Sequence, residues 1–507
     1  MFVTTWGVWE RRTVRQTAPW IVSPPATGRQ RDTRWVAGTP RCARHRRLRR
    51  PHSFPGGHYL SGGYRYSVHM QVATGAQVLP PTPQFTIDAN GYLYCEQVRV
   101  KDVQDAMGPL GSPFYLYSHA RIQQNYRAYA EALAGMDAII GYAVKANNNL
   151  RLLEMLRGMG SGAVLVSGNE LRLAQLAGFD MQKTVFNGNG KTPLEIDMAV
   201  HAGCLINIDS EFDLENIQAS ARRVATRARV ILRINPDIDP QVHPYVSTGL
   251  ASSKFGIRNA RLDWFLQSIR DNHDALELVG VHSHLGSTIT KVELFRDATA
   301  LMLQFVERIR QARFDTLRYL NIGGGLGIDY RRQGVRIPTP QELIDAVRPM
   351  LRGTDLTLIV EPGRSLVGDA GMLVTSVIGV KTNGSKNFIV VDGSMSEMIR
   401  PSLYDAYHYI TLIEPGIPGE PPHTYDVVGP VCESSDFLGK ERVLPLPAPG
   451  IGLAVMDSGA YCMSMASNYN MKVFPAEVLV DGNTWRVIRR RQSFDDLLRG
   501  YGEPRSR

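Results

Sequence analysis

The sequence predicts a (β/α)8 TIM barrel joined to a second, β-rich domain of the barrel or sandwich type. Eight short apolar runs follow one another between residues 138 and 361, and segments with helical periodicity separate most of them. Strand followed by helix, repeated, favours a parallel sheet, and eight such units close a barrel. From about residue 367 the pattern changes to short alternating runs, which favours a separate β-rich domain.

Each predicted barrel strand leads into a residue suited to catalysis, to ligand binding or to starting a helix. We expect the strands at residues 138–143, 163–166, 183–187, 204–208, 229–234, 278–283, 317–322 and 356–361. The residues that follow them are Lys145, Ser167, Asn187, Asp209, Asn235, His284, Gly323 and Glu361. Because the active site of such a barrel is built where its strands end, these residues describe one pocket. Ser167 and Glu170 have the spacing of a capping box at the start of the second helix.

The β-rich domain is expected to be assembled from both sides of the barrel. Residues 372–380 and 387–392 have strand character, and residues 91–98, ahead of the barrel, have a similar pattern. We expect a basic extension at residues 1–75 and a barrel at residues 112–366. The β-rich domain is expected in two pieces, at residues 76–111 and 367–507.

The composition excludes several other classes of protein. The 507 residues are 43% hydrophobic and 21% charged, which suits a globular protein of two or more domains. No run of about 18 or more uninterrupted apolar residues is present, which argues against a membrane span. The five cysteines are odd in number and have no CxxC spacing, so neither a disulfide framework nor a metal site is indicated.

The net charge of +9 comes from a basic N-terminal tail. Residues 1–69 contain thirteen arginines, no lysine and only two acidic residues, Glu10 and Asp32. The rest of the chain is mildly acidic and has no basic helix or aromatic platform, so we expect no nucleic-acid partner. The tail suits an organelle transit peptide, a disordered basic arm, or codons ahead of a natural start at Met70. The last alternative is favoured, and it implies a cytoplasmic protein; a genuine transit peptide would imply an organelle.

Lys145 is the first candidate for catalysis. It ends a strand between apolar Val144 and Ala146, and desolvation lowers the pKa of a lysine. A neutral lysine amine can form a Schiff base with an aldehyde such as pyridoxal phosphate. A single lysine at a strand end is more often an ordinary solvated residue, so this interpretation needs a phosphate cradle and a partner for the pyridine nitrogen on the same barrel face.

Both groups have candidates after the last two barrel strands. The run Gly323, Gly324 and Gly325 exposes backbone N–H groups to an anion, and barrels often bind phosphate after strands seven and eight. The run does not fit GxGxxG, so a dinucleotide site is not supported, and a tight turn is the alternative. The last strand leads into Glu361, which can keep a pyridine nitrogen protonated. Gly363 and Arg364 follow, and both are suited to binding an anion. The alternative for this segment is a buried structural ion pair.

Two histidines end the sixth predicted strand. The alternation of a strand points His282 and His284 to the same side. Metal ligation is disfavoured because no cysteine or carboxylate is nearby in the sequence. A histidine stacked on a cofactor ring, with Ser287 near its phosphate, suits the other motifs better, and His282 also suits a buried core position.

The sequence contains a series of short motifs in a fixed order: Tyr142-Ala143-Val144-Lys145-Ala146-Asn147, Ser167-Gly168-Asn169-Glu170-Leu171, His284-Leu285-Gly286-Ser287, Gly323-Gly324-Gly325, Glu361-Pro362-Gly363-Arg364, Arg400-Pro401-Ser402-Leu403-Tyr404, Cys432-Glu433-Ser434-Ser435-Asp436 and Gly459-Ala460-Tyr461. Together these motifs resemble the diaminopimelate decarboxylase family, pyridoxal phosphate enzymes of the alanine-racemase-type fold, over about residues 80–500. Segments 187–191 and 287–290 are similar to its plant-type branch, which would imply the chloroplast if the N-terminal tail is a transit peptide.

The resemblance implies a role for each motif. Lys145 would be the Schiff-base lysine, His284 the residue stacked on the ring, and Glu361 the partner of the pyridine nitrogen. The groups implied around the phosphate are Ser287, Gly323, Gly324, Gly325, Gly363, Arg364 and Tyr461. Those implied to bind the substrate are Arg364, Arg400, Tyr404, Glu433 and Tyr461. Cys432 would help to protonate the product, and it would come with Glu433 from the second subunit, so a homodimer with shared active sites is implied.

The implied reaction is decarboxylation of meso-2,6-diaminopimelate to L-lysine and carbon dioxide, the last step of lysine biosynthesis. Ornithine decarboxylases of this fold carry Asp where this chain has Glu433. Many bacterial family members carry Asp where this chain has Val164, which is a departure near Lys145. The alternatives are a decarboxylase for ornithine, arginine or carboxynorspermidine, and a non-catalytic binding relative, in which Lys145 or Cys432 should have been lost.

Overall fold

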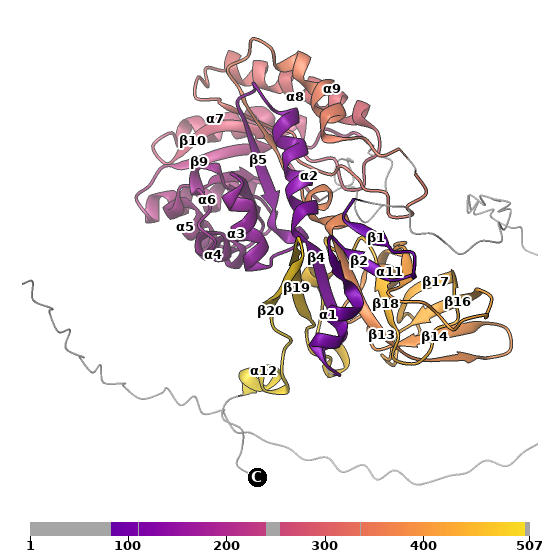
Figure 1. The fold of residues 1–507 in the computed structure, drawn as a ribbon. Coiled ribbons are helices and arrows are strands. Elements are labelled where there is room, and N and C mark those ends of the chain that lie inside the picture. Colours follow the sequence, from indigo (N-terminus) through magenta and orange to yellow (C-terminus); the bar gives the residue numbers. More distant parts are fainter. Residues whose placement is uncertain (1–82, 110, 240–253, 335, 502–507) are drawn as a thin grey trace, which may run out of the picture. The chain divides into compact units, whose positions relative to one another are not determined.

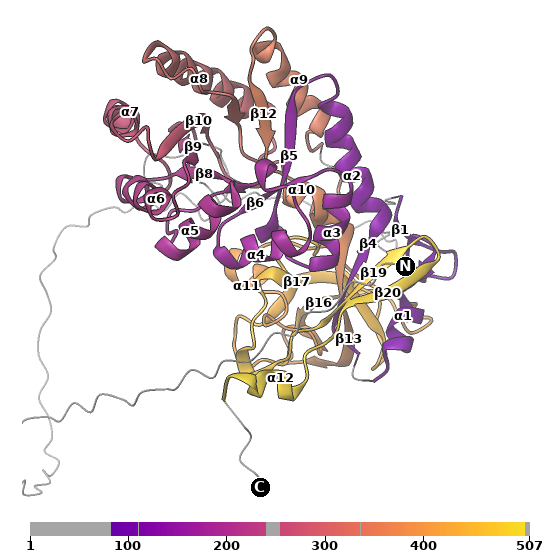
Figure 2. The same cartoon turned by 90° about the vertical axis from the view of Figure 1, so that its left-hand side faces the viewer.

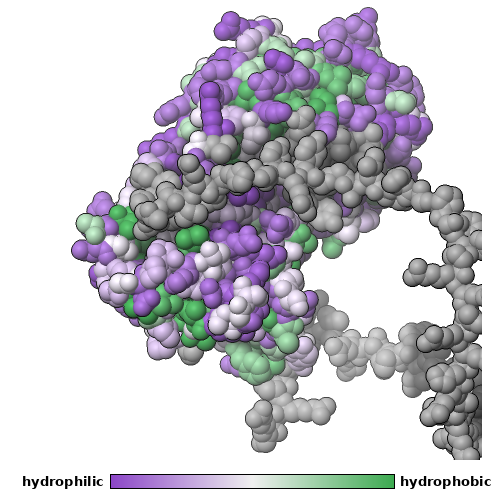
Figure 3. All heavy atoms as spheres, turned by 90° about the vertical axis from the view of Figure 1, so that its right-hand side faces the viewer, coloured by the Kyte–Doolittle hydropathy of each residue, from purple (hydrophilic) through white to green (hydrophobic). Residues whose placement is uncertain are grey.

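The computed structural model describes residues 83–109, 111–239, 254–334 and 336–501. The predictions for the basic tail and for the first residues of the β-rich domain, up to residue 82, therefore lie outside the described residues. None of the helices in the described ranges is long and apolar enough to cross a membrane. Hydrophilic side chains cover much of the face shown in Figure 3, and hydrophobic ones gather there in smaller groups.

Eight parallel strands close a barrel, as predicted (Figure 1). In chain order they are β5 (Ala138–Ala143), β6 (Gly162–Leu165), β7 (Val185–Phe186), β8 (Leu205–Ile208), β9 (Ala228–Arg233), β10 (Leu276–His282), β11 (Tyr319–Asn321) and β12 (Thr357–Val360). The pairing of β12 with β5 closes the ring, with Leu358 opposite Ala138. A compact cluster of side chains from six strands fills the inside: Val164, Val185, Leu205, Ile231, Val279 and Ile359.

Helices cover the outside of the barrel (Figure 2). Apart from the short α10 (Arg364–Val367), which follows the end of β12, they are α2 (His119–Ala132), α3 (Leu150–Gly158), α4 (Gly168–Leu176), α5 (Pro193–Ala202), α6 (Glu211–Arg223), α7 (Leu262–Asp271), α8 (Val292–Gln311) and α9 (Pro340–Leu351). The periodic apolar residues of each helix face the strands, and this burial supplies most of the stability of such helices.

The capping prediction at Ser167 is half correct. Ser167 is the N-cap of α4, and its hydroxyl accepts a hydrogen bond from the Glu170 N–H at 3.2 Å. The Glu170 carboxylate does not return to the cap residue, because it accepts the N–H of Val166 at 2.7 Å instead. Complete capping boxes are present at Thr192 and Thr339, each followed by a proline in the first turn.

The β-rich domain is assembled from both sides of the barrel, as predicted. Its main sheet has the order β17-β16-β14-β13-β4-β19-β20, and β18 pairs with both β13 and β15. These strands are β4 (Phe114–Ser118), β13 (Gly371–Thr382), β14 (Asn387–Val391), β15 (Ile410–Leu412), β16 (His423–Val428), β17 (Phe437–Leu444), β18 (Gly452–Val455), β19 (Ala476–Asp481) and β20 (Thr484–Arg489). A small sheet of β1 (Phe85–Ile87), β2 (Leu93–Cys95) and β3 (Val98–Arg99) precedes α1 (Val100–Met107).

The boundary expected at residue 112 needs a correction. Strand β4 lies in the sheet, antiparallel to β13 and parallel to β19, and the indigo β4 runs between orange and yellow strands in Figure 1. The chain therefore enters the barrel only at α2, which begins at His119. An apolar strand followed by a helix has the local pattern of a barrel unit, and only pairing with strands more than 250 residues away along the chain assigns β4 to the other domain. The remaining domain boundaries stay a proposal.

Candidate active site

A cavity of about 590 Å³ opens at the carboxyl ends of the barrel strands, where residues of the β-rich domain also reach it. It is large enough for a cofactor and a small substrate. Ten of the residues singled out from the sequence line it: Lys145, His284, Ser287, Gly325, Glu361, Gly363, Arg364, Arg400, Tyr404 and Tyr461. Of the eight predicted strand-end residues, only three line this cavity: Lys145, His284 and Glu361. The prediction that the strand ends form one pocket is therefore confirmed for these three, whereas Ser167, Asn187, Asp209, Asn235 and Gly323 do not line it.

Lys145 lies in a single helical turn directly after β5 and is exposed to this cavity. The expected desolvation of Lys145 by its neighbours is not observed, because Val144 and Ala146 are buried while Lys145 itself is exposed. The turn is held from the β-rich domain. Tyr461 N–H donates to the Ala146 carbonyl at 2.7 Å, and the Asn147 amide donates to the Gly459 carbonyl at 3.0 Å.

Glu361 lies at the floor of the cavity and is buried. One of its oxygens, Oε1, accepts the side-chain amides of Asn187 at 3.0 Å and Asn321 at 2.7 Å. The other, Oε2, lies 3.6 Å from His282 Nε2. Burial alone raises the pKa of a carboxyl group, but His282, His284 and the Asn321 amide outweigh it and hold the pKa of Glu361 far below its usual range. The cavity therefore has an ionised carboxylate at its floor.

The two histidines at the end of β10 have different environments. His282 is buried beneath Glu361, with its Nδ1 2.7 Å from the Asn207 amide nitrogen, and it does not line the cavity. His284 lines the cavity, and its Nδ1 accepts the N–H of Gly324 at 3.2 Å. Burial and the positive charge of Lys145 hold the pKa of His284 well below its ordinary value. A neutral, flat ring is therefore available beside Lys145.

The glycines after β11 make a tight turn, and one of them lines the cavity. Gly324 is buried against the next strand end, where an added Cβ atom would lie 2.0 Å from the Glu361 carbonyl oxygen. Gly325 has a φ of +119°, and its added Cβ would lie 2.2 Å from the Gly286 carbonyl oxygen. Of the run, only Gly325 lines the cavity; Gly323 and Gly324 lie behind it. A direct role of those two in binding the cofactor stays a prediction.

Two arginines, Arg364 and Arg400, line one wall of the cavity. Arg364 donates to Ser287 Oγ from both Nε, at 3.1 Å, and Nη2, at 3.0 Å. Its guanidinium also lies 4.7 Å from the ring centroid of Tyr461. Arg400, on the short helix α11 (Arg400–Tyr404), reaches the same cavity from the β-rich domain, and Tyr404 lines the cavity beside it. Two fixed cations on one wall are suited to binding a carboxylate or a phosphate.

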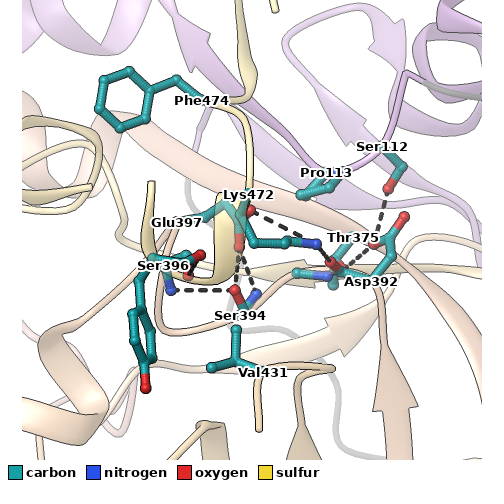
Figure 4. A network of polar contacts seen from close by, with 12 residues as sticks. Ser112, Pro113, Thr375, Asp392, Ser394, Ser396, Glu397, Val431, Lys472 and Phe474 are labelled. Atoms are coloured by element: carbon teal, nitrogen blue, oxygen red, sulfur yellow. Dashed lines mark hydrogen bonds and ion pairs between the residues drawn. The ribbon is translucent and has the colours of Figure 1, made fainter. Parts of the chain in front are cut away.

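A buried polar network in the β-rich domain fixes the segment that leads into α11 (Figure 4). Glu397 Oε2 accepts both the N–H and the hydroxyl of Ser394, at 2.8 and 2.6 Å. Lys472 Nζ donates to the Asp392 carbonyl at 3.0 Å and lies 3.9 Å from Glu397 Oε1. Arg400 begins α11 only three residues after Glu397. The network therefore determines the position of the Arg400 backbone.

Cys432 and Glu433 do not reach the cavity of their own chain. Both are exposed; the Cys432 N–H donates to Asn470 Oδ1 at 3.3 Å, and Glu433 Oε2 accepts the Tyr469 hydroxyl at 3.2 Å. Their loop is fixed by Asp436, whose carboxylate accepts two backbone N–H groups at 2.7 Å. The predicted site residues are therefore in two places, a set around the cavity and a pair on the surface.

Sequence reasoning missed Tyr330, which lines the cavity, and two buried residues that contact cavity residues, Asn321 and His408. Asn321 is a polar residue inside an otherwise apolar strand, which is a signal that could have found it. Tyr330, which contacts both arginines, lies in the loop after β11, and His408, which contacts Arg400, lies just before β15. Neither has a local signal: the arginines that Tyr330 contacts are 34 and 70 residues away along the chain, and the eight-residue spacing of Arg400 and His408 fits no repeating pattern.

Most of the chain is similar to known proteins. Residues 119–368 match the family model described as "Pyridoxal-dependent decarboxylase, pyridoxal binding domain". The chain is 57% identical over 431 residues to a protein of Oryza sativa subsp. japonica named probable diaminopimelate decarboxylase, chloroplastic; the match covers 85% of this chain and 87% of the rice protein. It is 41% identical to diaminopimelate decarboxylase of Aquifex aeolicus over 81% of this chain and 95% of that protein.

A solved structure is similar as well. The diaminopimelate decarboxylase of Helicobacter pylori in complex with L-lysine is 37% identical and superimposes with a TM-score of 0.74. The match covers 79% of this chain and 99% of that one.

Proposed function

Because the chain belongs to the diaminopimelate decarboxylase family, we propose that it converts meso-2,6-diaminopimelate to L-lysine and carbon dioxide, the last step of lysine biosynthesis. One observation supports this choice of substrate above the others. Lys145 and two arginines, Arg364 and Arg400, share one cavity, so a ligand attached near Lys145 can present a second carboxylate to a cationic wall.

The residues around Lys145 fit pyridoxal phosphate. Lys145 offers an amine for attachment of the aldehyde, and His284 offers a neutral ring face. The candidates for the phosphate are Ser287, Gly325, Gly363, Arg364 and Tyr461, together with the turn that Gly323 and Gly324 support. The fit of this cradle is tight, since a Cβ atom added to Gly363 would lie 3.3 Å from the Tyr461 hydroxyl oxygen. When bound, the cofactor supplies an electron sink for the bond that loses carbon dioxide.

The ionised Glu361 has a defined task in this proposal. It holds a proton at the pyridine nitrogen, which keeps the ring electron-poor. Asn187 and Asn321 hold the Glu361 carboxylate in one orientation, and His282 lies on its other side. The carboxylate at the non-reacting end of the substrate is bound by Arg364, Arg400 and Tyr404.

The surface position of Cys432 and Glu433 supports a homodimer with shared active sites. In this proposal, Cys432 of the partner subunit supplies the proton to the product, and Glu433 of the partner subunit contacts the distal ammonium of the substrate. Mixing Lys145→Ala subunits with Cys432→Ala subunits tests the arrangement. Each variant is inactive by itself, and random pairing restores about a quarter of the wild-type activity, because half of the dimers carry one intact site. No restored activity would reject shared sites.

The location of the protein is a separate proposal. The rice relative is named as chloroplastic, and the Arg-rich, acid-poor tail of this chain suits a transit peptide, so we favour the chloroplast over the cytoplasm expected from a start at Met70. Residues 1–82 fused to a fluorescent protein would accumulate in the plastids of leaf cells. Fluorescence confined to the cytoplasm would favour the Met70 start.

Complementation tests the enzymatic function in a cell. The gene is placed in a bacterial strain that cannot decarboxylate diaminopimelate and therefore needs lysine. Growth without lysine is expected from the wild type and not from the Lys145→Ala variant. Growth that depends on added lysine, with the protein folded and carrying its cofactor, would move the function to another basic amino acid or to a non-catalytic relative.

A further inference from the structure

Tyr330 lies between the two arginines of the cavity, and the proposed reaction gives it no role. Its hydroxyl oxygen accepts a hydrogen bond from Nη1 of Arg364 and another from Nη1 of Arg400, the latter at 3.0 Å. The guanidinium carbons lie 5.6 Å and 4.7 Å from the centroid of its ring. One side chain therefore contacts both cations through its oxygen and its ring.

Two guanidinium groups held this close repel each other, and Tyr330 offsets that repulsion. A phenol oxygen carries partial negative charge, and an aromatic face attracts cations. Arg400 has a second neutral acceptor in His408, whose Nε2 lies 2.8 Å from Nη1. His408 Nδ1 lies 2.8 Å from the Met456 carbonyl oxygen, so Nδ1 is the donor and Nε2 the acceptor. Burial, and then the charge of Arg400, hold the pKa of His408 well below its ordinary value.

The backbone around Tyr330 is fixed on both sides. Asp329 Oδ1 accepts the N–H groups of Arg331 and Arg332 at 3.1 and 3.0 Å. The Arg332 guanidinium makes two hydrogen bonds to the Asp457 carboxylate, at 3.0 and 2.7 Å, and both side chains are almost fully buried. This ion pair joins the loop after β11 to the β-rich domain, so the position of Tyr330 is determined by both domains.

We propose that Tyr330 is a positioning residue that determines specificity for ligands with a carboxylate at the non-reacting end. It sets the spacing of Arg364 and Arg400. Since both acceptor sites of its oxygen are used by the arginines, its own O–H remains to donate to one oxygen of that carboxylate. The inference rests on the proposed function, because it assumes that these arginines bind the second carboxylate of the substrate.

Two ligands that differ by one carboxylate test the inference. L-Lysine keeps the carboxylate of the non-reacting end, and cadaverine lacks it. Each is titrated by calorimetry into the cofactor-loaded wild type, into Tyr330→Phe and into Tyr409→Phe. The last variant is a matched control, because the Tyr409 hydroxyl is buried and has no hydrogen-bond partner among the residues that the structure describes.

We expect the affinity for L-lysine to fall about ten- to hundredfold in Tyr330→Phe and to stay unchanged in Tyr409→Phe. The affinity for cadaverine stays the same in all three proteins. In parallel, KM for meso-diaminopimelate rises by a similar factor in Tyr330→Phe while kcat changes by less than about threefold. The absorbance of the bound cofactor is unchanged, which shows that the Lys145 side of the cavity is intact.

Two results would overturn the inference. Unchanged lysine affinity in Tyr330→Phe would remove its hydroxyl from carboxylate binding, and equal losses for lysine and cadaverine would mean a general structural role. Failure of the proposed function is seen separately, because the wild type would then release no carbon dioxide from meso-diaminopimelate whatever Tyr330 does.

Discussion

Replacing Glu361 by Gln separates the charge of this carboxylate from its shape. Both amide donors, from Asn187 and Asn321, meet the same oxygen, Oε1. A glutamine carbonyl oxygen in that place keeps both hydrogen bonds but accepts them as a neutral group. Hydrogen bonds to charged groups contribute about 1.5–3 kcal/mol and neutral ones about 0.5–1.5 kcal/mol, so the two bonds together lose roughly 2–3 kcal/mol of stability.

Glu361→Ala is the matched comparison. It leaves two buried amide donors without a partner, at about 1–3 kcal/mol each, and also opens a cavity. We therefore expect the urea midpoint to fall further for Ala than for Gln. Both variants lose about 10²- to 10³-fold in kcat at saturating cofactor, because neither can hold a proton at the pyridine nitrogen by charge.

The stability difference between the wild type and Glu361→Gln also depends on pH. The pKa of Glu361 is lowered in the folded protein, so its carboxylate stabilises the fold above the pKa of an unfolded glutamate, about 4.3. The difference in urea midpoint is constant from about pH 8 to pH 5, and it decreases as the pH falls further toward the folded-state pKa. The reasoning is refuted if Gln and Ala destabilise equally, or if Gln keeps more than about a tenth of the wild-type kcat.

Three further changes have defined outcomes. Lys145→Ala abolishes the absorbance of covalently bound cofactor and all carbon dioxide release, and a spectrum that persisted would reject Lys145 as the attachment site. Gly324→Ala forces a Cβ atom to 2.0 Å from a backbone carbonyl oxygen and weakens cofactor binding at least about tenfold. In the control Gly327→Ala, the nearest atom to the added Cβ is 3.3 Å away, and cofactor binding changes little. Equal dissociation constants of the cofactor for the two variants would contradict this. Arg332→Gln leaves Asp457 buried without its ion pair and costs about 3–5 kcal/mol, measured by urea unfolding.

The barrel could be predicted from the sequence because its signals are local. Parallel strands buried on both faces are short apolar runs, and the helices between them have their own period. The predicted run 204–208 corresponds to β8 at Leu205–Ile208, and 138–143 to β5 at Ala138–Ala143. Strand β4 was misplaced because its neighbours in the sheet, β13 and β19, come from the other end of the chain.

The candidate site was predictable to the extent that its residues lie at strand ends or in family motifs. Tyr330 and His408 were missed since their importance comes from contacts with Arg364 and Arg400, which no local spacing shows. The exposure of Lys145 was missed for a similar reason. Apolar neighbours in sequence do not enclose a side chain when a turn points them elsewhere.

The structure shows where the departure at Val164 lies, without explaining it. Its side chain belongs to the cluster inside the barrel and also lines the cavity. A Cβ atom added to Gly141 would lie 2.8 Å from Val164 Cγ2, so the strand β5 packs closely on this valine.

The measurement that tests the central claim most directly is carbon dioxide release by the cofactor-loaded protein. It is offered meso-diaminopimelate, the LL isomer, ornithine and arginine in parallel, and lysine is measured in each reaction. The proposed function predicts release from the meso isomer alone, with lysine formed in equal amount. Release from ornithine or arginine instead would contradict it and move the function to polyamine synthesis, and no release from any of the four would favour a non-catalytic relative.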